Sequence, residues 1–298
     1  MKSFSQMTKE ELCKAEYTRE CCRQAVLAGM LLLGAVITKE KIRFVTENAD
    51  VLSVYMNQCE HQRLVRQKLL QPPEAVRYSA ELRDEEQIAA VLDQFRLLDP
   101  DTGVIRYRID PFLTEKECCR KAFVRGAFLS GGTVIDPKKN YNLEMVTPYL
   151  GLSRDMHRLL LECGFDFKMV TRKSKYVLYL KNSEAISDFL TYMGAYQAQM
   201  ELLNIKIEKE IRNDFNRTAN SETANLEKTI NASVRQVQAI EKIQRTRGLD
   251  SLPDDLREIA VLRLKHKELS LSELGMLMNP PLSKSGVNHR LKKLMELA

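Results

Sequence analysis

The sequence predicts an α+β fold, in which a duplicated domain of helices and antiparallel strands is followed by an all-helical segment. Two observations predict it. A stretch that begins at Glu20 recurs without a gap at Glu117, and the same succession of strand and helix patterns follows each copy. The last part of the 298-residue chain carries helical patterns alone. Helices grouped with short antiparallel strands are typical of the α+β class.

The repeat begins with a nearly identical hexapeptide, ECCRQA at 20–25 and ECCRKA at 117–122. Eight of the 18 positions from Glu20 to Ile37 are identical to those of the second copy. Chance similarity between two apolar helices would give about three or four identities, and the period is that of a whole domain rather than of a solenoid. We therefore infer an internal duplication.

Each copy opens with a helix, predicted at Glu20–Leu33 and Glu117–Ser130. Gly29 and Gly126 occupy the same place in the two helices. A glycine inside a helix costs about 1 kcal/mol relative to alanine, so its presence in both copies indicates a packing requirement. Small residues let two helix backbones approach closely. We predict that these helices pack against each other around a pseudo-two-fold axis; the alternative is two unrelated buried helices.

Alternating apolar residues predict the strands that follow, and helical spacing predicts the remaining helices. In the first copy we expect strands at Ala35–Ile37 and Ile42–Thr46, a helix at Ala49–Gln58, strands at Leu64–Leu69 and Val76–Leu82, and a helix at Glu85–Leu98. In the second copy we expect strands at Thr133–Ile135 and Tyr141–Thr147, a helix at Tyr149–Cys163, strands at Phe167–Thr171 and Tyr176–Leu180, and a helix at Ser183–Met193. The two copies join near Pro100–Gly103.

The ends of the first helices, residues 27–35 and 124–132, resemble the LAGLIDADG motif of homing endonucleases. The resemblance implies a duplicated LAGLIDADG-like αββαββα domain. In those nucleases the penultimate motif residue is acidic, and the two acids hold a divalent metal. Gly34 and Gly131 stand at these positions. Glycine offers no side-chain oxygen to Mg²⁺. The first carboxylate after Gly131 is that of Asp136. The resemblance therefore supports the fold and argues against nuclease activity.

The C-terminal part begins with a charged helix, Ala195–Phe215, and a polar stretch over 213–220. An amphipathic helix is predicted from Ser221 to about Arg245. Its apolar face comprises Leu226, Ile230, Val234, Val237 and Ile240. Pro253 marks the start of the next helix, and Ser270 with Glu273 forms a capping box for another.

The last helix starts at Ser283 or Ser285, after a turn at Met278–Pro281, and buries Val287, Leu291 and Leu294. Two short helices joined by a turn, the second rich in basic and amide residues, are typical of a helix-turn-helix. From Ile259 onward the sequence has seven Lys or Arg residues and three Glu residues, which gives a local charge of +4. This segment also resembles the fourth region of bacterial sigma factors, with a longer turn. The candidate DNA-binding residues are Ser283, Lys284, Ser285, Asn288, His289, Arg290, Lys292 and Lys293; a solvated basic face is the alternative.

Nearly the whole chain resembles the WhiA family. The resemblance is carried by residues 3–5 with 9–12, 125–132, 141–144, 225–229, Leu249 with 252–253, and 283–291. It implies a DNA-binding regulator that acts in cell division, chromosome segregation and, in spore formers, sporulation. We therefore divide the chain into a first LAGLIDADG-like half with an N-terminal helix, residues 1–105, a second LAGLIDADG-like half, residues 106–212, and a C-terminal helix-turn-helix DNA-binding domain, residues 213–298. Duplex DNA is the expected partner, and another transcription factor or RNA polymerase is a further candidate.

Charge and composition limit the kinds of partner and the cellular location that we expect. The net charge of +6 permits a polyanionic partner, and no apolar stretch reaches the roughly 18 residues that span a bilayer. With no signal-peptide pattern, we expect a cytoplasmic, nucleoid-associated protein with no membrane partner and reduced cysteines. The seven cysteines are Cys13, Cys21, Cys22, Cys59, Cys118, Cys119 and Cys163.

Adjacent cysteines on a helix point about 100° apart and seldom bind one ion, so core thiols are the favoured interpretation over a metal or redox role. The sequence predicts no catalytic residue, metal or cofactor. A metal-dependent endonuclease and a protein-interaction scaffold are the competing hypotheses to a DNA-binding regulator. The glycines at 34 and 131 disfavour the first, whereas the second is compatible with DNA binding.

Overall fold

The structure is a computed structural model that describes residues 2–64 and 77–298. The chain divides into two compact units, and the boundary along the sequence lies between Lys209 and Glu210. The predicted strand Leu64–Leu69 falls almost entirely outside the described residues, and Leu64 itself is not in a strand.

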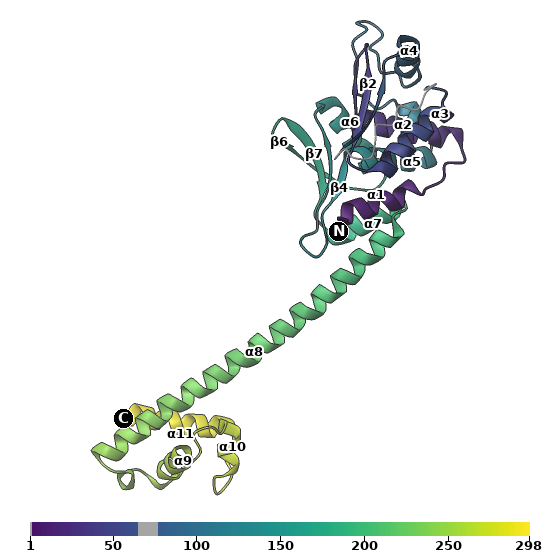
Figure 1. The fold of residues 1–298 in the computed structure, drawn as a ribbon. Coiled ribbons are helices and arrows are strands. Elements are labelled where there is room, and N and C mark those ends of the chain that lie inside the picture. The colour runs from purple at the N-terminus through teal and green to yellow at the C-terminus, as the bar shows by residue number, and fades with distance from the viewer. Residues whose placement is uncertain (1, 65–76) are drawn as a thin grey trace. The chain divides into compact units, whose positions relative to one another are not determined.

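The first unit contains both repeats, and their elements follow the predicted order (Figure 1). The first repeat comprises α1 (Phe4–Cys13), α2 (Glu20–Gly34), β1 (Ala35–Ile37), β2 (Ile42–Thr46), α3 (Ala49–His61), β3 (Tyr78–Leu82) and α4 (Glu85–Gln94). The second comprises η1 (Pro111–Thr114), α5 (Glu117–Gly131), β4 (Gly132–Val134), β5 (Leu143–Thr147), α6 (Leu150–Glu162), β6 (Lys168–Arg172), β7 (Lys175–Leu180) and α7 (Ser183–Met193).

The strands form antiparallel sheets in the orders β1-β2-β3 and β4-β5-β7-β6, which confirms the predicted α+β class. Helices lie on one side of the strands (Figure 1), and strand residues alternate between buried and exposed. Three predicted boundaries differ by two residues or more: α3 continues to His61 rather than Gln58, β5 begins at Leu143 rather than Tyr141, and α4 ends at Gln94 rather than at Leu98. Arg96 takes a positive φ of 50°, which ends the helix, and Leu98 forms a β-bridge with Ile105.

The helices α2 and α5 pack against each other at the centre of this unit, as the repeat predicted. Residues 25–32 of α2 are all buried, and their counterparts in α5 are buried apart from Arg125. Gly29 and Gly126 lie directly against the backbone of the opposite helix. The duplicated glycines therefore set the close approach of the two repeats.

Polar contacts join the connecting segment and the N-terminal helix to this core. The hydroxyl of Tyr107 accepts a hydrogen bond from the backbone N–H of Ile37 at 2.8 Å, and the Tyr107 ring stacks on Tyr149. The Glu11 carboxylate accepts hydrogen bonds from the backbone N–H groups of Gln197 and Ala198, at 2.7 and 3.0 Å. Glu11 thereby caps the first turn of α8 (Tyr196–Thr246).

The predicted break over 213–220 was wrong, since α8 is one continuous helix of 51 residues. Asn216, Thr218 and Asn220 have modest helix propensity, but each costs only a few tenths of a kcal/mol and no Gly or Pro interrupts the run. The apolar face predicted for its second part is only half buried. Leu226, Ile230 and Val234 are 61%, 51% and 47% exposed, whereas Val237 and Ile240 are buried.

The second unit contains the end of α8, followed by η2 (Leu249–Ser251), α9 (Asp254–Lys265), α10 (Leu271–Met276) and α11 (Lys284–Leu297). Its small core brings Ile240 and Ile243 of α8 together with Leu256 and Ile259 of α9 and with Leu291 of α11. This core fixes the position of α11.

Candidate nucleic-acid interface

The last helix, α11, buries the three residues that its spacing predicted. Val287, Leu291 and Leu294 are each fully buried. Of the two serines offered as caps, Ser283 is the N-cap, and its hydroxyl accepts a hydrogen bond from the backbone N–H of Gly286 at 3.3 Å. The Ser285 hydroxyl lies 3.0 Å from that of Ser283. Because these three apolar residues pack into the core, the opposite face of α11 lies toward solvent.

That opposite face carries nearly all of the residues predicted to bind DNA. Seven of them are exposed: Ser283, Lys284, Ser285, Asn288, His289, Lys292 and Lys293. Arg290 is the exception, because its side chain is 27% exposed and its Nε lies 3.6 Å from the Asp255 carboxylate. The structure therefore places Arg290 beside α9, away from the free basic face.

The turn that precedes α11 depends on a glycine in α10. The predicted capping box is present, since the Ser270 hydroxyl accepts from the Glu273 backbone N–H and the Glu273 carboxylate accepts from the Ser270 backbone N–H. Near the end of α10, the Gly275 carbonyl accepts a hydrogen bond from the Leu282 backbone N–H at 2.9 Å. A Cβ on Gly275 would lie 2.1 Å from the Leu282 carbonyl oxygen. Gly275 thereby allows the chain to fold back tightly into α11.

Side chains of α9 fix the loops on either side of α10. Arg263 is buried, and its guanidinium donates to the Leu269 carbonyl at 2.7 Å, with burial lowering its pKa. The Glu258 carboxylate accepts a hydrogen bond from the Asn279 backbone N–H at 3.0 Å. Sequence reasoning missed both residues, because nothing in their spacing tells which loop carbonyl or amide they will meet.

A shallow depression lies where α10 and α11 begin, lined by Leu271, Ser283, Lys284, Ser285 and Asn288. The first turn of α11 presents backbone N–H groups and the positive end of the helix dipole, which favour a phosphate oxygen. Exposed lysines add charge for further phosphates, and an exposed Asn can hydrogen-bond a base edge. This arrangement has the charge and the hydrogen-bonding groups that binding to a duplex requires.

The paired ends of α2 and α5 are packed rather than open. A Cβ on Gly34 would lie 2.5 Å from the Phe44 ring, and one on Gly131 would lie 3.1 Å from Leu33. Even the first atom of a carboxylate side chain therefore has little room here. Among the described residues, the one group of three or more His, Cys, Asp and Glu side chains that could hold a metal consists of cysteines at the other ends of these helices.

The exposed face of the sheets carries carboxylates beside its arginines. Glu144 of β5 accepts a hydrogen bond from Arg172 at 2.8 Å, and Glu81 of β3 accepts one from Arg83 at 2.7 Å. These pairs neutralise cations that would otherwise be free for phosphates. Arg43 of β2 and Lys175 of β7 are exposed as well, so the preference for α11 rests on its exposed lysines and on the N–H groups of its first turn.

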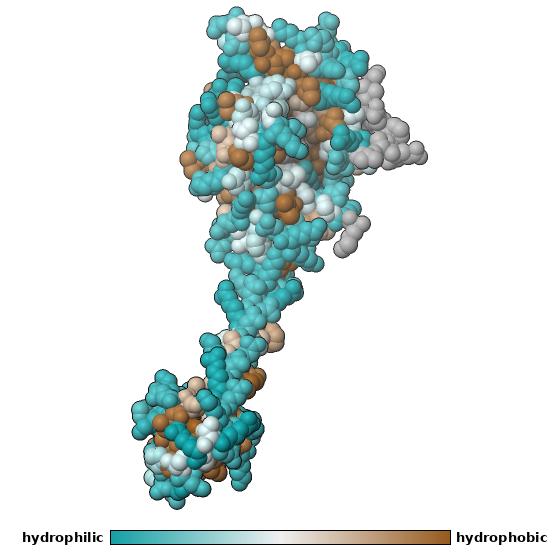
Figure 2. Space-filling view, turned by 90° about the vertical axis from the view of Figure 1, so that its left-hand side faces the viewer, coloured by the Kyte–Doolittle hydropathy of each residue, from teal (hydrophilic) through white to brown (hydrophobic). Residues whose placement is uncertain are grey.

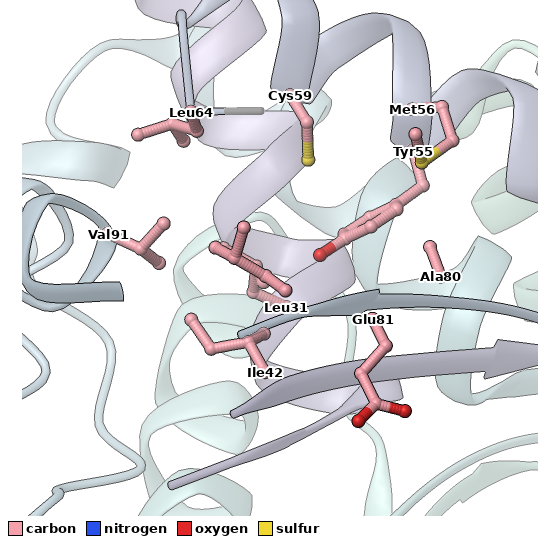
Figure 3. Close-up of a pocket in the computed structure, with 10 residues that line it drawn as sticks. Leu31, Ile42, Tyr55, Met56, Cys59, Leu64, Ala80, Glu81 and Val91 are labelled. Atoms are coloured by element: carbon pink, nitrogen blue, oxygen red, sulfur yellow. The ribbon is translucent and has the colours of Figure 1, made fainter. Parts of the chain in front are cut away.

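A pocket under the first sheet is part of the apolar core. Leu31, Tyr55, Cys59 and Val91 point into it, whereas the Glu81 carboxylate points away (Figure 3). Burial raises the pKa of the Cys59 thiol to about 12, so this thiol is not activated.

Figure 2 shows apolar residues as separate patches on a mostly hydrophilic face of the molecule. Within the described ranges, no helix is long and apolar enough to cross a membrane.

Comparisons with known proteins match both parts of the chain. The family model described as the WhiA LAGLIDADG-like domain matches residues 120–212, and that described as the WhiA C-terminal HTH domain matches 215–298. A "Probable cell division protein WhiA" of Ruminiclostridium cellulolyticum is 41% identical, over 99% of this chain and 97% of its own length. A protein of the same name from Alkaliphilus metalliredigens is 38% identical over the same shares.

A solved structure agrees with these matches. The crystal structure of full-length DUF199/WhiA from Thermatoga maritima has a TM-score of 0.61 and 26% sequence identity, and covers 99% of this chain and 98% of that one. The predicted LAGLIDADG-like and helix-turn-helix domains are therefore confirmed. With relatives of this identity matching along nearly their full length, the chain belongs to the WhiA family.

Proposed function

We propose that this chain is a DNA-binding transcription regulator that acts in cell division, and that it contacts DNA through α11. The observation that carries the proposal is the exposed basic and amide-bearing face of α11, opposite three fully buried apolar residues. The helix-turn-helix family match and the names of the relatives support it. Roles in chromosome segregation and sporulation, nucleoid association, and contact with another transcription factor or RNA polymerase belong to the same proposal.

Within this proposal the DNA contacts have distinct roles. Lys284, Lys292 and Lys293 bind phosphates, and the Ser283 and Ser285 hydroxyls hold a phosphate at the helix N-terminus. Asn288 and His289 lie on the same exposed face and read base edges. Arg290, held beside Asp255, contacts DNA only at the edge of this surface. We assign these contacts to a domain of residues 213–298.

We also propose that the chain is not a nuclease. The positions where LAGLIDADG nucleases carry acids are Gly34 and Gly131, and both are enclosed by neighbouring side chains. The LAGLIDADG-like halves, residues 1–105 and 106–212, then serve a binding or scaffolding role.

Mapping the sites bound in living cells tests the proposal. Tagged wild-type chain should enrich discrete chromosomal sites, and the double variant Lys292→Ala/Lys293→Ala should lose them. The matched control is Lys138→Ala/Lys139→Ala, which removes the same charge from an exposed turn of the first unit. Equal enrichment by all three proteins, or none by the wild type, would contradict a DNA-binding role for α11.

A further inference from the structure

Four cysteines from the two repeats lie together where α2 and α5 begin. The Sγ atoms of Cys21, Cys22, Cys118 and Cys119 all lie within 4.8 Å of one another. The adjacent pair Cys118 and Cys119 has its sulfurs 3.9 Å apart. Adjacent cysteines on a helix point about 100° apart, but the side chains of this pair turn toward each other, and the second helix brings two more sulfurs to the same place.

The duplication explains why the thiols meet. Each pair sits in the first turn of its helix, at the second and third helical positions. Cys22 precedes Gly29, and Cys119 precedes Gly126, by about two turns, so these cysteines lie on the helix faces that pack together. Two helices held in contact at the glycines must therefore bring both pairs of thiols to the pseudo-two-fold axis.

We propose that these four thiols bind one Zn²⁺ ion as a tetrathiolate site that links the two repeats. A tetrahedral zinc site has Zn–S bonds of about 2.3 Å, which places its sulfurs about 3.8 Å apart. The observed limit of 4.8 Å is thus within about 1 Å of the required spacing. Thiolates are soft ligands that select zinc over oxygen-preferring ions such as Mg²⁺. An iron–sulfur cluster would hold its ligand sulfurs farther apart than a single ion does.

The surrounding charges suit such a site. Four thiolates around Zn²⁺ leave a net charge of −2, and the positive ends of two helix dipoles converge on it. The Arg19 guanidinium lies 3.8 Å from the Cys118 sulfur. Lys121 and Arg125 line the adjoining pocket together with Cys22 and Cys118, and Glu16 is the carboxylate there.

The same pocket gives an ion a way in, because it opens to solvent beside Cys22 and Cys118. Cys119 is buried, whereas Cys21 and Cys118 are partly exposed. With four protein ligands the site has no open position for a substrate, so its role is structural.

This site is distinct from the one that LAGLIDADG nucleases use. Gly34 and Gly131 stand at the opposite ends of α2 and α5, about 18 Å along the helix axes. A zinc ion at the cysteines would clamp the helix pair at one end, while the glycines at 29 and 126 pack it near the middle. The zinc site is independent of DNA binding by α11, so either proposal can fail alone.

The test uses the full-length chain, purified under reducing conditions from zinc-supplemented medium. Zinc per chain is measured by mass spectrometry of the elements, and Co²⁺ is substituted to give d–d bands that report tetrahedral thiolate coordination. The variant is Cys22→Ser/Cys119→Ser. The matched control is Cys13→Ser/Cys163→Ser, which removes two thiols outside the cluster. Cys21→Ser serves as a milder variant if the double variant fails to fold.

The wild type and the control should each hold one zinc ion and give the same cobalt bands. The cluster variants should lose zinc affinity by more than the roughly 10–100-fold that loss of an outer partner costs. A chelator should lower the melting temperature of the wild type and control but not that of the variants. No cobalt bands in the wild type, equal zinc in all proteins, or the absorption of an iron–sulfur cluster would each overturn the proposal.

Discussion

Gly29 and Gly126 each lie against a backbone carbonyl of the opposite helix, in a nearly symmetric relationship. A Cβ on Gly29 would lie 2.3 Å from the Phe123 oxygen, and one on Gly126 would lie 2.1 Å from the Val26 oxygen. Backbone atoms cannot swing aside as the end of a side chain can. The two glycines therefore set the distance between the repeats.

Replacing either glycine should destabilise the first unit. Alanine normally improves a helix by about 1 kcal/mol over glycine. For Gly29→Ala and Gly126→Ala we instead expect a loss of about 1–3 kcal/mol in the free energy of unfolding, because the added methyl overpacks the contact. Urea unfolding of the full chain measures this. The control is Gly151→Ala in α6, where the new Cβ meets the Arg108 side chain at 2.8 Å and a backbone atom, the Tyr107 oxygen, only at 3.8 Å. Similar curves for all three variants would mean that α2 and α5 do not approach closely.

Stability should fall with rising pH because of buried thiols such as Cys59. Burial raises the pKa of Cys59 from 9.0 to about 12 in the folded chain. Between these values the unfolded chain has lost the proton that the folded chain keeps, so the free energy of unfolding decreases as pH rises. The contribution of one such thiol approaches about 1.4 kcal/mol per pH unit. Cys59→Ala should flatten the measured dependence from pH 9 upward by that order, and an unchanged slope would contradict the assignment.

Arg290 and Asp255 should be energetically coupled. Their side chains lie 3.6 Å apart and are 27% and 53% exposed, so we expect a coupling of about 0.2–1 kcal/mol. A double-mutant cycle of Arg290→Gln and Asp255→Asn, followed by thermal unfolding, gives this value. If the effects of the two substitutions on stability are strictly additive, the two side chains act independently. Arg290 would then count with the exposed basic residues of α11.

The chain should bind duplex DNA without cutting it. Metal-assisted cleavage needs carboxylates around the ion, and Gly34 and Gly131 supply none. Incubation with Mg²⁺ or Mn²⁺ and a DNA that the chain binds should leave both strands intact on a denaturing gel. Nicking that persists through purification and stops on chelation would contradict the proposal. Asp136→Asn would then be the first variant to examine.

Much of the fold could be predicted because its signals are local or repeated. The Ser270–Glu273 capping box and the buried Val287, Leu291 and Leu294 depend on spacing within one helix. The repeat predicted the α2–α5 pair because the same glycine stands in both copies. Weak helix formers over 213–220 suggested a break that the structure does not have, since low propensity alone does not end a helix.

What the sequence could not predict depends on contacts between distant segments. The spacing of the cysteines within one helix does not reveal their cluster, which exists only once the two helices pack. In the sequence, Arg290 cannot be told apart from the other basic residues of the last helix, because its partner, Asp255, comes from another helix. Spacing gives the face of a helix that a residue occupies, but not the partner that reaches that face from another element.

If the exposed face of α11 binds the DNA backbone, its lysines should determine how strongly the affinity for DNA depends on salt. Affinity for one duplex is measured by fluorescence anisotropy over a range of salt, for wild type, Lys292→Ala/Lys293→Ala and the control Lys138→Ala/Lys139→Ala. Removing one lysine that binds a phosphate should lower the slope of log K against log salt by about 1. The slope of the α11 variant should therefore fall by about 2 and its binding should weaken, while the control matches the wild type. An α11 variant that folds correctly and keeps the wild-type affinity and slope would remove this helix from the interface.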